Sequence, residues 1–253
     1  MSLRGLDQKI IVVTGAAQGI GAGYARRLVE EGSTVVLADR NRDGVEATAS
    51  SLGGPGKATA YQLDVSDRAG CEAFAAQLTA AYGRVDGLVN NAAVFSTIRM
   101  KPFWEITDEE WDRLMAVNLR GPWLLVSALL PLLRAAESAS VVNIGSDAVQ
   151  LGRPGYLHYV VSKGGVHGMT FSMARELGEF GIRVNTLSPG PVYTEVARET
   201  VTPQQRESMI RAQALHRPAG PDDMSGMAAF LLSDDSAYLT GQTISVNGGL
   251  VHR

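Results

Sequence analysis

Short apolar runs alternate with longer helical stretches along the whole chain of 253 residues. We predict strands over 9–13, 34–38, 58–63, 86–90, 139–145, 182–187 and 243–246, each but the last followed by a helical stretch. The first run is apolar and β-branched, as is typical of a strand buried on both faces. Strands joined through helices form a parallel sheet with right-handed crossovers. The sequence therefore predicts a single α/β domain over residues 1–253, a doubly wound parallel sheet of about seven strands with helices on both faces.

A glycine-rich turn, Thr14 to Gly21, lies between the first strand and a helical pattern that ends near Gly32. Strand, glycine turn and helix are the context that a dinucleotide site requires. The glycines let the backbone approach a pyrophosphate, and the helix N-terminus offers free N–H groups and the positive end of the helix dipole. The alternative is a turn whose glycines only pack the helix tightly against the sheet.

The second strand ends in Asp39, 18 residues after Gly21. This offset is close to the ~20 residues expected for a carboxylate that binds the adenosine ribose and repels a 2′-phosphate. Arg40 could bind that phosphate, but no Lys or Arg lies within the glycine turn. The balance favours NAD over NADP. The alternative is that Asp39 only caps the helix that starts near Asn41.

Tyr159 and Lys163 are four residues apart in the run Y-V-V-S-K. On a helix, residues at this spacing share one face. An ammonium beside a phenol favours the phenolate and lowers a pKa that is ordinarily about 10. A tyrosine tuned in this way is a general acid/base that works near neutral pH. Tyr156 is followed four residues later by Val160, so it has no ammonium on its face, and we expect it to line a substrate pocket.

Taken together, these stretches resemble the short-chain dehydrogenase/reductase family, and the resemblance covers nearly the whole chain. The family motifs occur in family order: T-G-x-x-x-G-x-G at 14–21, Asp64-Val65, Asn90-Asn91-Ala92, Asn118, Ser146, Tyr159-x-x-x-Lys163, and Pro189-Gly190 followed by Val192 and Thr194. Two positions depart from the family pattern. Ala93 stands where glycine is common, and Asn247-Gly248-Gly249 replaces the usual D-G-G.

The resemblance implies a Rossmann-type fold and NAD-dependent interconversion of a secondary alcohol and a ketone. It implies Tyr159 as the proton donor and acceptor, Lys163 as the group that lowers its pKa and holds the nicotinamide ribose, and Ser146 as the group that orients the substrate oxygen. Together with Asn118 these are the expected catalytic residues. The expected cofactor-binding residues are Gly15, Gln18, Gly19, Ile20, Gly21, Asp39, Asp64, Val65, Asn90, Asn91, Ala92, Tyr159, Lys163, Pro189, Gly190, Val192 and Thr194.

Asn118 lies four residues before Pro122, inside a helical run over 108–133. Proline cannot donate an N–H to the carbonyl four residues back, and its ring crowds that carbonyl. Our hypothesis is that Pro122 kinks the helix and frees the Asn118 carbonyl to hold a water. The resemblance implies that such a water links Lys163 to solvent in a proton relay.

The substrate itself is not predicted by the sequence. The expected pocket residues are mainly apolar or aromatic: Val94, Phe95, Ser146, Ala148, Val149, Tyr156, Pro191 and Tyr193. Residues 191–217 are expected to form a lid, because they follow the Pro189-Gly190 turn and join two sheet elements. A sugar alcohol, a ring alcohol, an aryl alcohol and a hydroxyacid all remain open.

Composition narrows the class of partner. A net charge of −3 with no basic run argues against nucleic acid. One cysteine, Cys71, excludes an internal disulfide and suits a cytoplasmic protein. With no signal peptide and no apolar run of 18 or more residues, we expect no membrane span. The histidines have no metal-ligand spacing, so no metal site is predicted.

Two other functions remain open. One is an NADPH-dependent reductase of 3-oxoacyl chains on a carrier protein, which would favour a basic residue in the glycine turn where Gln18 stands. The other is a non-catalytic protein that keeps the fold and binds the cofactor. The resemblance also implies a homotetramer or homodimer, assembled through the helices near 108–133 and 155–178 and the C-terminal strand.

Overall fold

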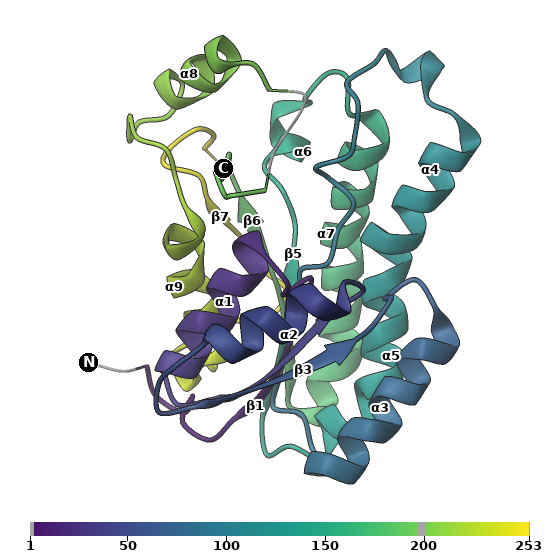
Figure 1. Cartoon of the computed structure of the whole chain (residues 1–253), viewed down its shortest axis with the longest axis vertical. Coiled ribbons are helices and arrows are strands. Elements are labelled where there is room, and N and C mark those ends of the chain that lie inside the picture. The colour runs from purple at the N-terminus through teal and green to yellow at the C-terminus, as the bar shows by residue number, and fades with distance from the viewer. Residues whose placement is uncertain (1–2, 197–200, 253) are drawn as a thin grey trace.

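A parallel sheet forms the centre of the molecule in the computed structural model (Figure 1). Within residues 3–196 and 201–252, which the structure describes, seven strands pair in the order β3-β2-β1-β4-β5-β6-β7. All seven predicted strands are present, with bounds that differ from the predicted ones by at most two residues. They are β1 Ile10–Thr14, β2 Thr34–Asp39, β3 Lys57–Gln62, β4 Gly87–Asn90, β5 Ala139–Ile144, β6 Ile182–Pro189 and β7 Thr243–Val246.

Helices cover both faces of the sheet, as Figure 1 shows. One face carries α1 (Gly19–Glu30), α2 (Arg42–Ser51) and α9 (Pro221–Leu232), and the other carries α3 (Arg68–Tyr82), α5 (Gly121–Arg134) and α7 (Leu157–Leu177). Neighbouring strand residues alternate between the two cores: Val12 packs with α3 and α5, while Val13 packs with α1 and α9. This is the period-2 alternation of a strand. It explains why both faces of β1 are apolar over the four consecutive residues Ile10 to Val13.

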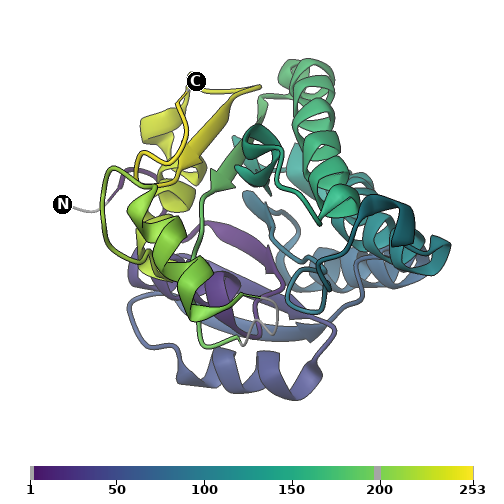
Figure 2. The same ribbon diagram turned by 90° about the horizontal axis from the view of Figure 1, so that it is seen from above.

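The carboxyl ends of the strands meet along one edge of the sheet, which Figure 2 views from above. After β3 the chain crosses back to place β4 beside β1, on the opposite side from β2. The turns that follow β1 and β4 therefore diverge. Ligands of open α/β sheets bind in the crevice at such a reversal of strand order. Three shorter helices surround this edge: α4 (Asp108–Met115), α6 (Ala148–Leu151) and α8 (Pro203–Arg211).

The helical run predicted over 108–133 is interrupted as expected. A π-helical turn, Ala116–Arg120, separates α4 from α5, and the Gly121 N–H donates to the carbonyl of Ala116, five residues back. Pro122 stands in the first turn of α5, where its missing N–H costs little. The whole run, Asp108–Arg134, is long and apolar enough to cross a membrane, yet half of its most apolar window is buried inside the protein. Core helices meet the same criterion.

A chain of buried polar side chains ties α7 to the middle of the sheet. The Asn90 amide donates to Oδ1 of Asn143 (2.9 Å), and the Asn143 amide donates to Oγ1 of Thr170 on α7 (2.9 Å). The Thr186 hydroxyl on β6 donates to the same Thr170 oxygen (2.8 Å). Buried polar groups that satisfy one another fix a single relative position of the elements that carry them. The register of α7 on the sheet is set in this way.

Asp86, the residue before β4, links the first and fourth strands. Its Oδ2 accepts the Ile10 N–H (2.8 Å) and the Nε–H of Arg84 (3.1 Å), and the residue is only 7% exposed. The carboxylate thus satisfies a backbone donor at the start of β1.

We expect Asp86→Ala to lower the free energy of unfolding by about 1–3 kcal/mol, because it leaves the buried Ile10 N–H without an acceptor. Glu72→Ala is the matched control, since it removes an exposed carboxylate 3.9 Å from Arg68, a pair expected to contribute less than ~1 kcal/mol. Urea unfolding followed by circular dichroism measures both. Equal effects of the two substitutions would contradict this role of Asp86.

Candidate active site

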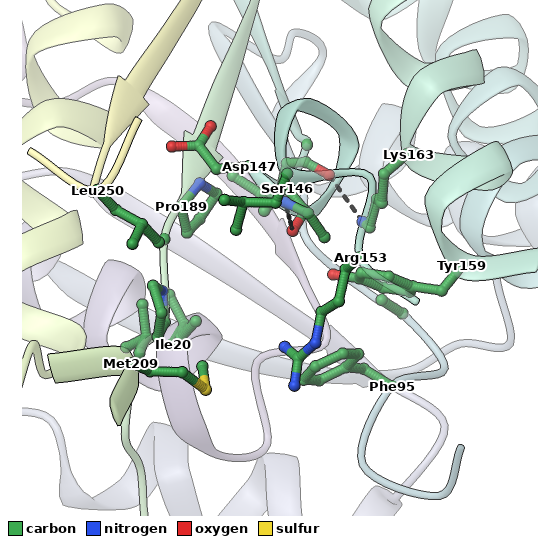
Figure 3. Close-up of a pocket in the computed structure, with 18 of the residues that line it drawn as sticks. Ile20, Phe95, Ser146, Asp147, Arg153, Tyr159, Lys163, Pro189, Met209 and Leu250 are labelled. Carbon is green, nitrogen blue, oxygen red and sulfur yellow. Dashed lines mark hydrogen bonds between the residues drawn. The ribbon is translucent and has the colours of Figure 1, made fainter. Parts of the chain in front are cut away.

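Two adjoining cavities open along the carboxyl ends of the strands. The larger has a volume of about 510 Å³ and lies between α8 and the loops that follow β4, β5 and β6 (Figure 3). The smaller, about 290 Å³, follows the glycine turn and the ends of β2 and β3. Four residues line both of them: Ile20, Asn91, Ala93 and Phe95. The two cavities therefore lie side by side and share part of their walls.

The glycine turn has no room for side chains. Gly15 has a φ of +64°, and a Cβ there would lie 2.8 Å from the Cα of Ala92. A Cβ on Gly21 would collide with the carbonyl oxygen of Gly15. The Asn91 amide donates to the carbonyls of Thr14 (2.9 Å) and Gly15 (3.1 Å). The loop after β4 thus holds the turn in a shape that only glycine permits.

The N-terminus of α1 faces the smaller cavity. Gln18 precedes the helix without a side-chain cap. The N–H of Gly19 donates instead to Oε1 of Glu195 (2.7 Å), a residue in the segment after β6. A carboxylate is a favourable partner there because the helix dipole is positive at its N-terminus. Thr194, next to Glu195, lines the same cavity.

Asp39 ends β2 beside the glycine turn. Its Oδ2 accepts the Ala17 N–H (3.1 Å), and its Oδ1 accepts the Asn41 N–H (2.9 Å). The cap of α2 is Asn41, whose side chain accepts the Gly44 N–H (3.1 Å), so the helix-cap alternative for Asp39 does not describe the structure. Asp39 and Arg40 both line the smaller cavity, as do Asp64, Val65 and Ala92.

Lys163 is buried in the wall of the larger cavity, with 3% of the residue exposed. Its ammonium donates to the carbonyl of Ile144 at the end of β5 (2.7 Å). Burial lowers the pKa of Lys163 to about 8, so the charged form still predominates at neutral pH. The Nζ atom lies 5.9 Å from the ring centroid of Tyr159, which lines the same cavity. The predicted phenol and ammonium do share one face of α7.

Ser146 lines the same cavity from the loop after β5 (Figure 3), where its Oγ accepts the Ala148 N–H (3.2 Å). The next residue, Asp147, is fully buried and accepts hydrogen bonds from Ser245 Oγ (2.8 Å) and the Asn247 amide (2.6 Å). These bonds lock the loop to the C-terminal strand. The aspartate that is more usual in the family at position 247 could not donate a hydrogen bond to the Asp147 carboxylate. The amide of Asn247 can, and it does so here.

The expected pocket residues divide into three groups. Phe95, Ser146, Ala148 and Pro191 line the larger cavity, and Val94 lines the smaller one. Among the described residues that line the two cavities, Val149, Tyr156 and Tyr193 are not found. Tyr156 immediately precedes α7 and turns its ring into the core, 1% exposed, with its centroid 6.1 Å from that of Phe95. Tyr193 packs instead against the guanidinium of Arg206 (4.3 Å).

Two of the expected asparagines stand behind the cleft. Asn90 was expected to line the cleft, but its side chain donates to Asn143 instead. Strand side chains alternate between the two faces, and it is the next residue, Asn91, that faces the cavities. Asn118 is 1% exposed, and its side chain both donates to the Val94 carbonyl (3.1 Å) and accepts the Val94 N–H (2.7 Å). Asn118 therefore holds the loop that carries Phe95.

The remaining expected residues lie in the cleft. Pro189, Gly190 and Val192 line the larger cavity, and Gln18, Gly19 and Gly21 line the smaller. Helix α8 contributes Gln205, Ser208 and Met209 to the larger cavity, within the segment 191–217 that we expected to form a lid. Residues 197–200 of that segment lie outside the described residues. In the part of the chain that the structure describes, no group of three His, Cys, Asp or Glu side chains is placed to hold a metal ion.

Two charged residues of the larger cavity, Asp147 and Arg153, were not anticipated. Arg153 lies six residues before Tyr159, in the loop between α6 and α7. Its position in the stretch G-R-P-G, between Ser146 and Tyr159, was a signal that it would lie near the site. The direction of its side chain was not predictable, because Gly152 and Gly155 both adopt positive φ and turn the chain twice.

Comparison with known proteins agrees with this geometry. A family model described as enoyl-(acyl carrier protein) reductase matches residues 15–251. A 3-oxoacyl-[acyl-carrier-protein] reductase of Thermotoga maritima is 35% identical over 97% of this chain and 99% of its own. D-threitol dehydrogenase of Mycolicibacterium smegmatis is 36% identical over 96% of this chain and 93% of its own.

The fold is matched by a solved structure as well. The crystal structure of a 3-ketoacyl-(acyl-carrier-protein) reductase from Brucella melitensis in complex with NADH superimposes with a TM-score of 0.90. That protein is 31% identical, and the match covers 97% of this chain and 99% of the other. Sequence, sheet order and site geometry lead to the same conclusion: the chain belongs to the short-chain dehydrogenase/reductase family of oxidoreductases, which bind a nicotinamide cofactor.

Proposed function

We propose that this protein interconverts a secondary alcohol and a ketone, with NAD as the hydride carrier. One observation carries the proposal: Tyr159 and the buried ammonium of Lys163 share a cavity with Ser146, and that cavity adjoins the one along the glycine turn.

The smaller cavity fits the adenosine and pyrophosphate part of a dinucleotide. Glycines without room for a Cβ let a pyrophosphate reach the backbone, and the α1 N-terminus supplies N–H donors and a favourable dipole. Leu63, Asp64 and Val65 at the end of β3 would flank the adenine. Pro189, Gly190, Val192 and Thr194 would hold the nicotinamide end at the junction of the two cavities.

Asp39 favours NAD over NADP. Its carboxylate lies at the edge of the smaller cavity and is held by the N–H groups of Ala17 and Asn41. A fixed negative charge accepts hydrogen bonds from ribose hydroxyls and repels a 2′-phosphate. Arg40 lines the same cavity, but the turn itself contributes no basic side chain to offset Asp39.

Tyr159 would be the general acid/base of the reaction. When bound, the nicotinamide supplies the hydride transfer itself. Tyr159 would take the hydroxyl proton of the alcohol, or return it to the ketone oxygen, and Ser146 would hold that oxygen in place. The charge of Lys163 would stabilise the phenolate, because burial reduces the screening of that charge.

Asn118 is proposed to serve the proton relay. The π-helical turn breaks the regular hydrogen-bond ladder at this residue, and π-turns recur at functional sites. A carbonyl released by that break would accept a water that passes protons from Lys163 to solvent. The Asn118 side chain is already occupied by the Val94 backbone, so only its main chain is available for this role.

A second candidate is reduction of 3-oxoacyl chains on a carrier protein. It is favoured by the name of the Thermotoga maritima relative, which is a 3-oxoacyl-[acyl-carrier-protein] reductase. Against it, Gln18 stands in the glycine turn where an NADPH enzyme would favour a basic residue. A non-catalytic role as a cofactor-binding protein is disfavoured because Ser146, Tyr159 and Lys163 all line one cavity.

We further propose a cytoplasmic homotetramer or homodimer and a mobile lid that includes α8. Support for assembly comes from apolar side chains on the outer faces of two helices: Trp123 on α5 is 45% exposed and Phe171 on α7 is 50% exposed. Support for the lid is that α8 contributes lining residues to the larger cavity from above the sheet edge (Figure 2).

We expect Tyr159→Phe to lower kcat by about 10²–10⁴-fold, the usual contribution of a general acid/base. The Kd for NADH should stay nearly unchanged, because the ring is retained. Steady-state assays and NADH fluorescence titration measure the two effects. Tyr82→Phe, which removes a phenol on α3 that contacts Thr59, is the control and should keep full activity. Near-normal turnover by Tyr159→Phe would refute the assignment.

We expect Asp39→Asn to shift the ratio of kcat/KM for NAD to that for NADP towards NADP by about 10-fold or more, since repulsion of the 2′-phosphate is removed while the shape of the side chain is kept. Asp39→Ala should act in the same direction with a larger loss of NAD affinity. Asp43→Asn, an exposed acid in the first turn of α2, is the control. An unchanged cofactor ratio in both Asp39 variants would exclude the ribose role.

The Glu195 carboxylate accepts the Gly19 N–H, a backbone donor that a bound pyrophosphate would use. Two anions cannot share the Gly19 N–H, so we expect Glu195→Gln to lower the Kd for NADH by roughly 3- to 10-fold, part of the value of a charged hydrogen bond. Glu207→Gln on the exposed face of α8 is the control. Fluorescence titration measures both, and unchanged or weaker binding by Glu195→Gln would show that the contact does not compete.

A further inference from the structure

The larger cavity contains a charged side chain that the proposed reaction does not use. Arg153 lines the cavity from the loop between α6 and α7. Figure 3 shows its side chain directed into the opening, with the guanidinium between Met209 and Phe95 in that view. Long charged side chains ordinarily extend into water. A guanidinium turned into an apolar cavity needs an explanation.

The guanidinium is held over an aromatic ring. Its Cζ atom lies 4.6 Å from the ring centroid of Tyr156, which is 1% exposed and packed beside Phe95. Stacking uses the face of the guanidinium and leaves its N–H donors free along the edge. Tyr156 therefore acts as a platform that fixes the direction in which Arg153 can donate. No ion pair between described residues includes Arg153.

The cavity as a whole carries positive charge. Its basic residues are Arg153 and Lys163, and the one acid among its described lining residues is Asp147. That carboxylate is fully buried and already accepts from Ser245 and Asn247. Much of the remaining wall is apolar, with Phe95, Met209 and Leu250. Arg153 is partly buried and has no ion-pair partner among the described residues, so a bound anion would give it a charged hydrogen bond.

We propose that Arg153 binds a carboxylate of the substrate, and hence that the substrate is a hydroxyacid and the product the matching oxoacid. The inference rests on the proposed function and selects among the substrate classes that it allows. A planar guanidinium edge matches a carboxylate with two parallel hydrogen bonds. A phosphate monoester carries about −1.5 to −2 charges at neutral pH, which one arginine would leave partly uncompensated.

The placement also separates the two ends of the substrate. Phe95 lies between the two tyrosines: its ring centroid is 4.7 Å from that of Tyr159 and 6.1 Å from that of Tyr156, over which Arg153 stacks. A substrate whose oxygen meets Tyr159 and whose carboxylate meets Arg153 would lie across Phe95. We therefore expect an apolar segment between the carbinol and the carboxylate, and acids of different chain length test how long it is.

The first test is kinetic. NADH-dependent reduction of levulinate, 5-oxohexanoate and 6-oxoheptanoate is compared with reduction of their methyl esters, in the unmodified protein and in Arg153→Met. At least one acid should be preferred over its ester by about 10- to 100-fold in kcat/KM, the value of a charged hydrogen bond. Arg153→Met should remove that preference mainly through KM, with little effect on the ester. Arg153→Lys should restore part of the preference for the acid, because the ammonium supplies the positive charge but cannot form the two parallel hydrogen bonds of a guanidinium.

The control is an arginine stacked on an aromatic ring elsewhere. Arg134 lies 4.0 Å from the ring centroid of Phe180 and does not line the larger cavity. Arg134→Met removes the same charge and the same kind of stacking, and it should leave the preference for the acid unchanged.

A second test does not depend on turnover. Isothermal titration calorimetry compares hexanoate with hexanamide, and phenylacetate with phenylacetamide, on the protein with and without NADH. The carboxylates should bind about 10-fold or more tightly than the amides, and Arg153→Met should abolish the difference. The inference fails if acids have no advantage in either test, or if Arg153→Met retains it. Carboxylate binding without any ketone reduction would instead overturn the proposed function and leave the anion site standing.

Discussion

The site is organised around one interaction, the hydrogen bond from the buried ammonium of Lys163 to the carbonyl of Ile144. The ammonium has lost most of its water, and burial lowers its pKa to about 8. It remains charged at neutral pH, and because both side chains are buried its charge is screened less at Tyr159 than it would be in bulk water. The same bond joins the end of β5 to α7. An ammonium in this place therefore requires that helix and strand keep one relative position.

The two cavities of the cleft differ in what forms their walls: mainly backbone at the glycine turn, and mainly side chains in the larger cavity. At the glycine turn, contacts to Ala92, Asn91 and the Gly15 carbonyl leave no space for substitution. The larger cavity is bounded by side chains from α8 and from the loop that carries Arg153. Changes there alter shape and charge without disturbing the turn or Lys163. A common chemistry with variable selectivity is the expected result of such an arrangement.

Much of this structure could be predicted from the sequence because the signals were local. Strands β1 and β2 contain clear apolar runs, and the Tyr159–Lys163 spacing required only that the segment be helical. The interruption at Ala116–Arg120 was foreseeable from Pro122, although its form as a π-helical turn was not. The orientation of Tyr156, Tyr193 and Asn90 could not be predicted, because it depends on which face of an element meets the core. Arg153 was missed because two left-handed glycines direct its loop.

The polar chain from Asn90 through Asn143 and Thr170 to Thr186 has an evolutionary consequence. Each member satisfies another inside the protein, so an apolar replacement at one position strands the partner's donor or acceptor. Mutations at such coupled positions are not additive. Among natural relatives, these four positions should covary, with rare compound replacements separating lineages that otherwise keep all four.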